Sequence, residues 1–199
     1  VWGVKEITQK CDNMIYGTEG NDVIYGYSKM SQYDNSKETF YAGAGNDTVY
    51  GKEGSDIIYG EAGSDSLYGG NGDDVLVGGT GNDYLSGDYG NDTYVFNLGD
   101  GQDTICEYES SATSGKADKI VFGEGIKEED VKLHRAGNNL IIRYSDKDQV
   151  TVKDAYYYGD DRTQIENIEF ANGTVWGVKE ITQKCDNMIY GTEGNDVIY

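Results

Sequence analysis

Residues 42–95 read AGAGNDTVY, GKEGSDIIY, GEAGSDSLY, GGNGDDVLV, GGTGNDYLS and GDYGNDTYV, which are six blocks of nine residues without a gap. Gly stands at the fourth place of every block, Asp at the sixth, and an apolar or aromatic residue at the eighth. A period kept through six blocks is the signature of a repeat architecture in which each unit stacks on its neighbours. This stretch therefore decides the fold.

The same period continues towards the N-terminus. A block GTEGNDVIY occupies residues 17–25. A degenerate block before it has Asn13 at the sixth place and Ile15 at the eighth. Residues 39–41, Thr-Phe-Tyr, fit places seven to nine. Residues 26–38 are therefore predicted to form one turn of thirteen residues instead of six, with the register kept.

The period also continues past Val95. Residues 98–106 fit one more degenerate block, provided that Phe96 and Asn97 are extra residues. The block at the end of the chain, residues 191–199, copies residues 17–25.

A second, longer repeat encloses the first. Residues 175–199 are identical to residues 1–25, VWGVKEITQKCDNMIYGTEGNDVIY, so the repeating unit is 174 residues long. Such an identity does not arise by chance. It indicates one unit and the start of the next from a tandem array, with an engineered overhang as the alternative.

The chemistry of one block predicts a short turn followed by a short strand. Glycine tolerates the positive φ angles that tight turns require, and the three residues after the turn alternate outward, inward and outward. Two blocks make one flattened coil, and coils stack at about 4.8 Å, the spacing of neighbouring strands. The predicted fold class is all-β, a parallel β-roll with two nonapeptides per coil.

Coiling aligns the sixth-place carboxylates in two rows. One row contains Asp22, Asp47, Asp65, Asp83 and Asp103, and the other contains Asp56, Asp74 and Asp92, with Glu38 in the inserted turn. Like charges about 5 Å apart repel by roughly 3 kcal/mol at an effective dielectric constant of about 20. Ca²⁺, which takes six or more oxygen ligands, relieves this repulsion; Mg²⁺ demands a stricter geometry, and zinc prefers His and Cys, of which the chain has one and three.

The blocks resemble the nonapeptide G-G-x-G-x-D-x-U-x of the RTX, or haemolysin-type, calcium-binding proteins. The resemblance implies a Ca²⁺ ion between each turn and the turn of the next coil, about five to eight ions per unit. The implied carboxylate pairs are Asp22/Asp47, Asp47/Asp65, Asp65/Asp83, Asp56/Asp74 and Asp74/Asp92, with Glu38/Asp56 and Asp83/Asp103 as pairs in which one turn departs from the pattern.

The resemblance also assigns calcium ligands residue by residue. These are the carboxylates named above with Asp196, and the turn residues Gly17, Glu19, Asn21, Ala42, Ala44, Asn46, Gly51, Glu53, Ser55, Gly60, Ala62, Ser64, Gly69, Asn71, Asp73, Gly78, Thr80, Asn82, Gly87, Tyr89 and Asn91.

Residues 107–176 change character and are predicted to form a β-rich cap. Strand patterns occur at 119–122, 131–134, 140–144, 149–152, 165–170 and 174–176, and short helices are expected at 127–131 and 178–184. The phrases GDGQDTI (99–105), DKIVFGEGI (118–126) and IEFANGTVW (168–176) resemble the haemolysin-type calcium-binding-related region, although ANGT replaces the usual ADGT. A stack of coils leaves an open apolar end, which such a segment would cover.

The predicted organisation has four parts: residues 1–11 end a preceding unit, 12–106 form the roll with its insertion at 26–38, 107–176 form the cap, and 177–199 start the next unit as a copy of 3–25.

Composition limits the partners and the compartment. The formal net charge of −20 argues against nucleic acid and anionic membranes, and neither membrane insertion nor a signal peptide is predicted. Low hydrophobicity with high charge predicts a largely unfolded apo state. The resemblance implies type I secretion to the exterior or the bacterial cell surface.

Cys106 and Cys185 are expected to be free thiols, with a disulfide as the alternative.

Other candidate sites are weaker. Tyr25, Tyr50 and Tyr68 on one face, and Tyr41 and Tyr59 on the other, are expected to form outward ladders. Cross-strand stacking explains them, and a carbohydrate- or receptor-binding face is the alternative for the first three. The insertion 26–38 and the acidic–aromatic stretch 156–161 could also contact a partner. His134 is the single histidine and suggests no catalytic triad or zinc motif.

The predicted function is that of a calcium-folded extender repeat of a large secreted or surface-bound RTX adhesin, with neighbouring tandem units as partners. The alternative is the secretion and folding module of an RTX exoenzyme, such as a protease, lipase or polysaccharide-modifying enzyme, or of an RTX toxin. No catalytic residue is expected in this segment. The duplication favours the extender, since one secretion module suffices for an enzyme.

Overall fold

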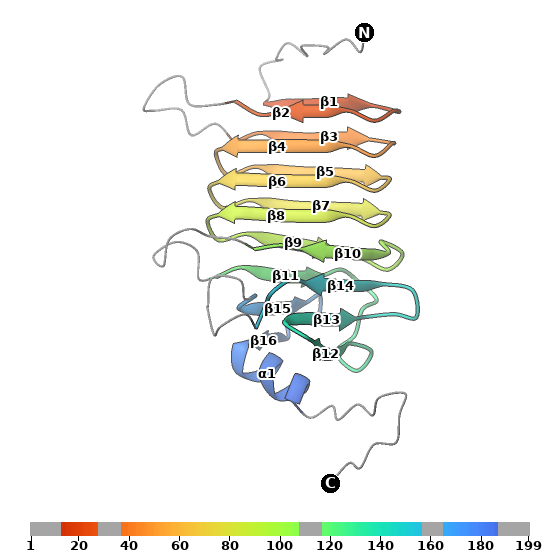
Figure 1. The fold of residues 1–199 in the computed structure, drawn as a ribbon, viewed down its shortest axis with the longest axis vertical. Helices are drawn as coiled ribbons and strands as arrows, with labels where there is room; N and C mark the ends of the chain where they lie inside the picture. Colours follow the sequence, from red (N-terminus) through yellow and green to blue (C-terminus); the bar gives the residue numbers. More distant parts are fainter. Residues whose placement is uncertain (1–12, 28–36, 108–116, 157–164, 187–199) are drawn as a thin grey trace.

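The computed structural model describes residues 13–27, 37–107, 117–156 and 165–186. In these ranges the chain forms two eight-stranded sheets and one helix (Figure 1). One sheet contains, in spatial order, β1 (Met14–Thr18), β3 (Thr39–Gly43), β5 (Ile57–Ala62), β7 (Val75–Thr80), β9 (Thr93–Phe96), β11 (Lys119–Phe122), β15 (Asn167–Phe170) and β16 (Val175–Gly177). The other contains β12 (Lys132–Ala136), β13 (Asn139–Arg143), β14 (Gln149–Val152), β10 (Gln102–Ile105), β8 (Tyr84–Tyr89), β6 (Ser66–Asn71), β4 (Thr48–Glu53) and β2 (Val23–Tyr25).

Successive strands alternate between the two sheets, so two blocks make one coil. Within a sheet the coils pair in parallel, and block partners lie 18 residues apart, as in Val49↔Leu67 and Ile58↔Leu76. Figure 1 shows the coils stacked along one axis, with β1 and β2 at one end and the helix at the other. The predicted parallel β-roll is confirmed.

The eighth-place residues fill the space between the sheets. Strands β3 to β7 alternate partly exposed and buried positions in their first four residues. The buried eighth-place residues include Val49, Ile58, Leu67, Leu76 and Leu85, all fully inaccessible. The core of a coil is therefore only one apolar side chain deep from each sheet. Such a thin core leaves much of the stabilisation to the turns.

The three irregular blocks keep the register that the sequence predicted. Phe40 pairs with Ile58 and with Ile15, so both the degenerate first block and the block after the insertion lie in phase. β10 pairs with β8 through Ile105↔Leu85, which places the degenerate block 98–106 in the stack.

The C-terminal segment, residues 117–186, is built onto the same two sheets. β11 pairs in parallel with β9, and β14 pairs in parallel with β10. Antiparallel pairing appears only beyond these strands, within the described ranges, between β12 and β13, β13 and β14, and β15 and β16. The six strands expected here are present, while the boundary placed at residue 107 remains a prediction.

One of the two expected helices is present. α1 (Val178–Asp186) follows β16 and packs over β12 and β16. The helix expected at 127–131 is wrong: this stretch is a turn closed by a hydrogen bond from the Asp130 N–H to the Lys127 carbonyl oxygen. Five residues offer too few hydrogen bonds to offset the cost of helix nucleation.

The two described cysteines are free thiols, Cys106 partly exposed and Cys185 buried, so the disulfide alternative is not realised. Among the described residues, no helix is long and apolar enough to cross a membrane.

Candidate metal centre

The sixth-place carboxylates lie in two rows, one along each edge of the roll. In each row the Asp Oδ1 atom accepts a hydrogen bond from the backbone N–H of the equivalent residue one coil earlier, at 2.7–2.9 Å. The first row runs Asp22, Asp47, Asp65, Asp83, Asp103, and the second runs Glu38, Asp56, Asp74, Asp92, Asp118. The predicted rows are present, and the Asp carboxylates from Asp47 and Asp56 onward are each held at Oδ1 by the preceding coil.

The fifth-place side chains form a second ladder of opposite direction. The Asn21 and Asn46 Oδ1 atoms accept hydrogen bonds from the N–H groups of Asn46 and Ser64, one coil later, at 2.8 Å. On the other edge, the Asp73 Oδ1 atom accepts the Asn91 N–H at 2.9 Å. The backbone N–H groups of adjacent turn residues therefore donate in opposite directions along the stack, one to the preceding coil and one to the following coil.

The second oxygen of the row carboxylates is buried and has no donor. Within the described part of the chain, this holds for the Oδ2 atoms of Asp47, Asp56, Asp65, Asp74, Asp83 and Asp103. Each of these residues is at most 2% exposed. A buried carboxylate oxygen without a hydrogen bond or a counter-ion is costly, so these atoms mark the positions where a cation fits.

The first glycine of each block makes room for the carboxylate. A Cβ atom built on Gly51 would lie 2.5 Å from the Gly69 carbonyl oxygen and 2.7 Å from the Asp56 Oδ2 atom. The equivalent two groups of the next block, the Gly78 carbonyl oxygen and the Asp65 Oδ2 atom, crowd a Cβ atom on Gly60. Beside Gly51, Gly60 and Gly69, the carboxylate oxygen of the Asp five residues later thus converges with a carbonyl oxygen of the following coil.

Burial makes these carboxylates poor anions in the metal-free protein. Burial, partly offset by the backbone hydrogen bond, raises the pKa of Asp74 to about 8 and the pKa values of Asp56, Asp83 and Asp103 to about 7. Repulsion between row neighbours adds to the rise. A bound cation would reverse both effects and keep the rows ionised.

The donor set selects a hard cation. In the described ranges, no group of three or more His, Cys, Asp and Glu side chains gathers around one point. The oxygens available are row carboxylates and turn carbonyls; the carbonyls of Ala62, Asn71 and Thr80 each accept one fourth-place N–H at 2.9 Å and keep a second lone pair. Oxygen donors of this kind suit Ca²⁺ and not zinc.

The second row continues beyond the residues that the nonapeptide pattern predicts. Asp118, 2% exposed, accepts the Asp92 N–H through Oδ1 at 2.7 Å, and its own N–H donates to the Glu166 Oε2 atom at 2.9 Å. Asp118 lies 26 residues after Asp92, without the phased glycines. The signal was present in Asp118-Lys-Ile120, which repeats the sixth and eighth places, but the nonapeptide phase was lost.

The first row ends differently. Val150 takes the position opposite Asp103 on β14, and the Asp148 carboxylate instead accepts the N–H groups of Gly99 and Gly101 at 3.0 and 3.2 Å. Of the remaining predicted ligands, first- and third-place residues such as Gly51 and Glu53 lie within strands β4 to β8, and their role as calcium ligands stays a prediction. Asp196 lies outside the described residues.

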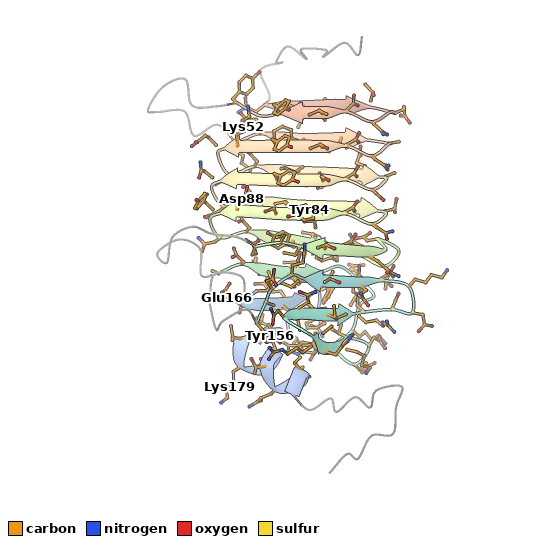
Figure 2. All side chains as sticks on the ribbon, in the orientation of Figure 1. Lys52, Tyr84, Asp88, Tyr156, Glu166 and Lys179 are labelled. Atoms are coloured by element: carbon orange, nitrogen blue, oxygen red, sulfur yellow. The ribbon has the colours of Figure 1, made fainter. Side chains whose placement is uncertain are left out.

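The tyrosines form the expected ladders. Ring centroids of Tyr25, Tyr50 and Tyr68 are 5.2 and 4.9 Å apart, and those of Tyr41 and Tyr59 are 5.1 Å apart, with nearly parallel ring planes in each pair. Figure 2 shows Tyr84 and Lys52 along this stack of strands; the Lys52 Nζ atom lies 5.0 Å from the Tyr25 ring. Because stacked rings cover one another's faces, the ladder offers a partner mainly edges and hydroxyl groups. Binding of sugar there stays a prediction.

Other candidate contacts are settled only in part. His134 pairs with Ile141 on the β12–β13 hairpin, and burial lowers its pKa. Most of the insertion, residues 28–36, and of the acidic–aromatic stretch, residues 157–161, lies outside the described residues.

Comparisons with known proteins agree with this geometry. The RTX calcium-binding nonapeptide repeat model matches residues 12–28, 34–67, 41–76, 68–105 and 186–199, more than half of the chain. The haemolysin-type calcium-binding protein related domain matches residues 139–180.

Two individual proteins show partial similarity. The iron-regulated protein FrpA of Neisseria meningitidis serogroup C is 38% identical over 113 residues, which are 54% of this chain and 9% of that protein. The crystal structure of the extracellular lipase LipA from Serratia marcescens overlaps with 74% of this chain and 39% of its own, at 15% identity and a TM-score of 0.31, too low to identify a shared architecture. The chain thus spans only a small part of the curated relative.

Proposed function

Because this chain belongs to the RTX calcium-binding nonapeptide repeat family, we propose that it is an extender unit of a secreted or surface-bound adhesin, folded by calcium outside the cell. This proposal rests on two features taken together: the buried Oδ2 atoms along both edges of the roll and the 174-residue duplication. The first makes folding depend on an ion, and the second makes the unit repeat.

Calcium acts as the switch between a loose and a rigid chain. Extracellular modules bind Ca²⁺ at about 10⁻⁴–10⁻³ M. At about 2 mM Ca²⁺ each site then contributes roughly 1–2 kcal/mol of folding free energy, and almost none at cytosolic levels. Five to eight sites per unit together contribute about 5–16 kcal/mol, which is comparable to the net free energy of unfolding of a typical domain. The unit stays loose before export and becomes rigid afterwards.

The architecture suits a spacer better than a catalyst. Coils add length along one axis, and each coil contacts only its neighbours, so copies lengthen the molecule without a new core (Figure 1). An array of such units would hold a distal binding region away from the cell surface. We expect no catalysis from this segment.

The test has two arms. Far-UV circular dichroism of the purified chain should report a β-rich fold at 2 mM Ca²⁺ and a mostly unfolded chain in EDTA. The full reading frame should contain many consecutive 174-residue units. A β-rich spectrum in EDTA would refute calcium-driven folding, and one or two units after a catalytic or pore-forming domain would replace the extender with the exoenzyme or toxin module.

A further inference from the structure

The first coil ends the roll with apolar side chains in solvent. β1 and β2 are the terminal strands of the two sheets, and Met14, Tyr16, Val23 and Tyr25 are 41–58% exposed. The same places in the next coil are partly buried, because a further coil covers them. Among the described residues, no strand pairs with the outer edge of β1 or β2.

The opposite end of the unit is closed. Trp176 on β16 is buried and meets Phe170 edge-on at 4.7 Å, and the Lys184 Nζ atom lies 4.1 Å from the Trp176 ring. Ile181 and Cys185, one helical turn apart, place the apolar side of α1 against the segment. At the rim of this end, Val175 and Val178 are 47% and 42% exposed.

The long repeat puts these two ends next to each other. α1 ends at Asp186, and residues 188–192 repeat the sequence of β1. One residue, Asn187, separates the helix from the start of the following roll, and one residue spans about 3.8 Å. No linker is available for consecutive units to swing apart.

We propose that the open end formed by β1 and β2 docks onto the α1–β16 end of the preceding copy, so that consecutive units form one continuous, stiff rod. The contact is head-to-tail, which generates an open filament instead of a closed oligomer. The exposed Val175 and Val178 of one copy and Met14, Tyr16, Val23 and Tyr25 of the next are the apolar surfaces that it covers. This inference rests on the proposed tandem function and adds the partner surface.

The test uses the present chain extended after Tyr199 by its own residues 26–199, which gives two complete units. Tyr16→Ser with Val23→Thr alters the free end, and the identical pair Tyr190→Ser with Val197→Thr alters the junction. Both variants lose the same stacking on the following coil, such as that of Tyr16 on Tyr41, so their difference isolates the junction.

In saturating calcium, the junction variant should melt at least ~3 °C below the free-end variant, which corresponds to about 1 kcal/mol for a unit of this size. Small-angle scattering of the unaltered two-unit chain should fit one rigid rod. Equal melting shifts for the two variants, with scattering from two units in many relative orientations, would overturn the junction. Loss of calcium-dependent folding in a single unit would instead refute the proposed function.

Discussion

The coils of the roll and the C-terminal segment lie in the same two sheets, yet their interiors differ. The roll places one eighth-place side chain per strand between the sheets, mostly aliphatic, and has buried carboxylates along both edges. The C-terminal segment packs Phe122 against Tyr144 and Phe170 at 5.0 and 5.6 Å, and Phe170 against Trp176. Ion pairs between described side chains, Lys119–Glu169 and Lys127–Glu129, also lie in this segment.

The roll and the C-terminal segment share the same two sheets, yet different interactions stabilise each of them. Aromatic burial stabilises the C-terminal segment whatever the ionic conditions. In the roll, charge repulsion and desolvation of the carboxylates oppose folding until a divalent ion compensates them. The C-terminal segment can thus close the stack, while the roll responds to calcium.

Removal of calcium should have the largest effect. In EDTA, the roll should lose the slow amide exchange of β4 to β9, because its buried carboxylates then repel without a counter-ion. The β12–β13 hairpin and α1 should retain more protection than the roll. Hydrogen–deuterium exchange with and without 2 mM Ca²⁺ measures this difference, and equal protection of the roll in both conditions would contradict it.

Truncation of the aromatic cluster should weaken the other region. Phe122→Ala should lower the free energy of unfolding by about 3–5 kcal/mol, since it removes a fully buried ring. The number of ions bound, measured by calorimetric titration, should stay unchanged, because Phe122 lies outside the rows. If the variant binds fewer ions while it is still folded, the two regions are not stabilised separately.

A methyl group at a first-place glycine should remove one ion. The Cβ atom of Gly69→Ala would collide with the Asp74 Oδ2 atom and lie 2.9 Å from the Gly87 carbonyl oxygen. We expect a loss of about 1–3 kcal/mol and one bound Ca²⁺ fewer. Gly20→Ala is the matched control, because no atom lies within 4 Å of its Cβ position. The same stoichiometry in both variants would show that the carboxylate does not bind through that oxygen.

Acidification should stabilise the calcium-free roll, because protonation removes the charge of its buried carboxylates. We expect this to be the smallest of the four effects. Burial raises the pKa values in the metal-free roll, from about 6 for Asp65 to about 8 for Asp74. Because the folded state binds protons more tightly than the unfolded chain, stability is highest below pH ~4 and falls as the pH rises through 6 to 8. Circular dichroism in chelator-resin-treated buffer should show more β-structure at pH 5 than at pH 8. The opposite trend would mean that the carboxylates are not desolvated.

Much of this fold follows from the nine-residue period alone. The period placed Phe40, Glu38 and Asp103 in register across two irregular blocks, because only one phase buries the eighth-place residue. It could not place Asp118, whose turn has no phased glycine. Nor could it show that the cap continues both sheets. The pairing of β11 with β9 is a long-range contact, and no sequence repeat predicts it.

The central claim is that divalent ions between successive coils bind the second oxygen of each row carboxylate. Anomalous diffraction from crystals grown in saturating calcium tests it most directly. The account predicts calcium peaks along both edges, each beside the Oδ2 atom of a row residue such as Asp56, Asp65 or Asp74. Well-ordered coils with no calcium peak at these oxygens would contradict it.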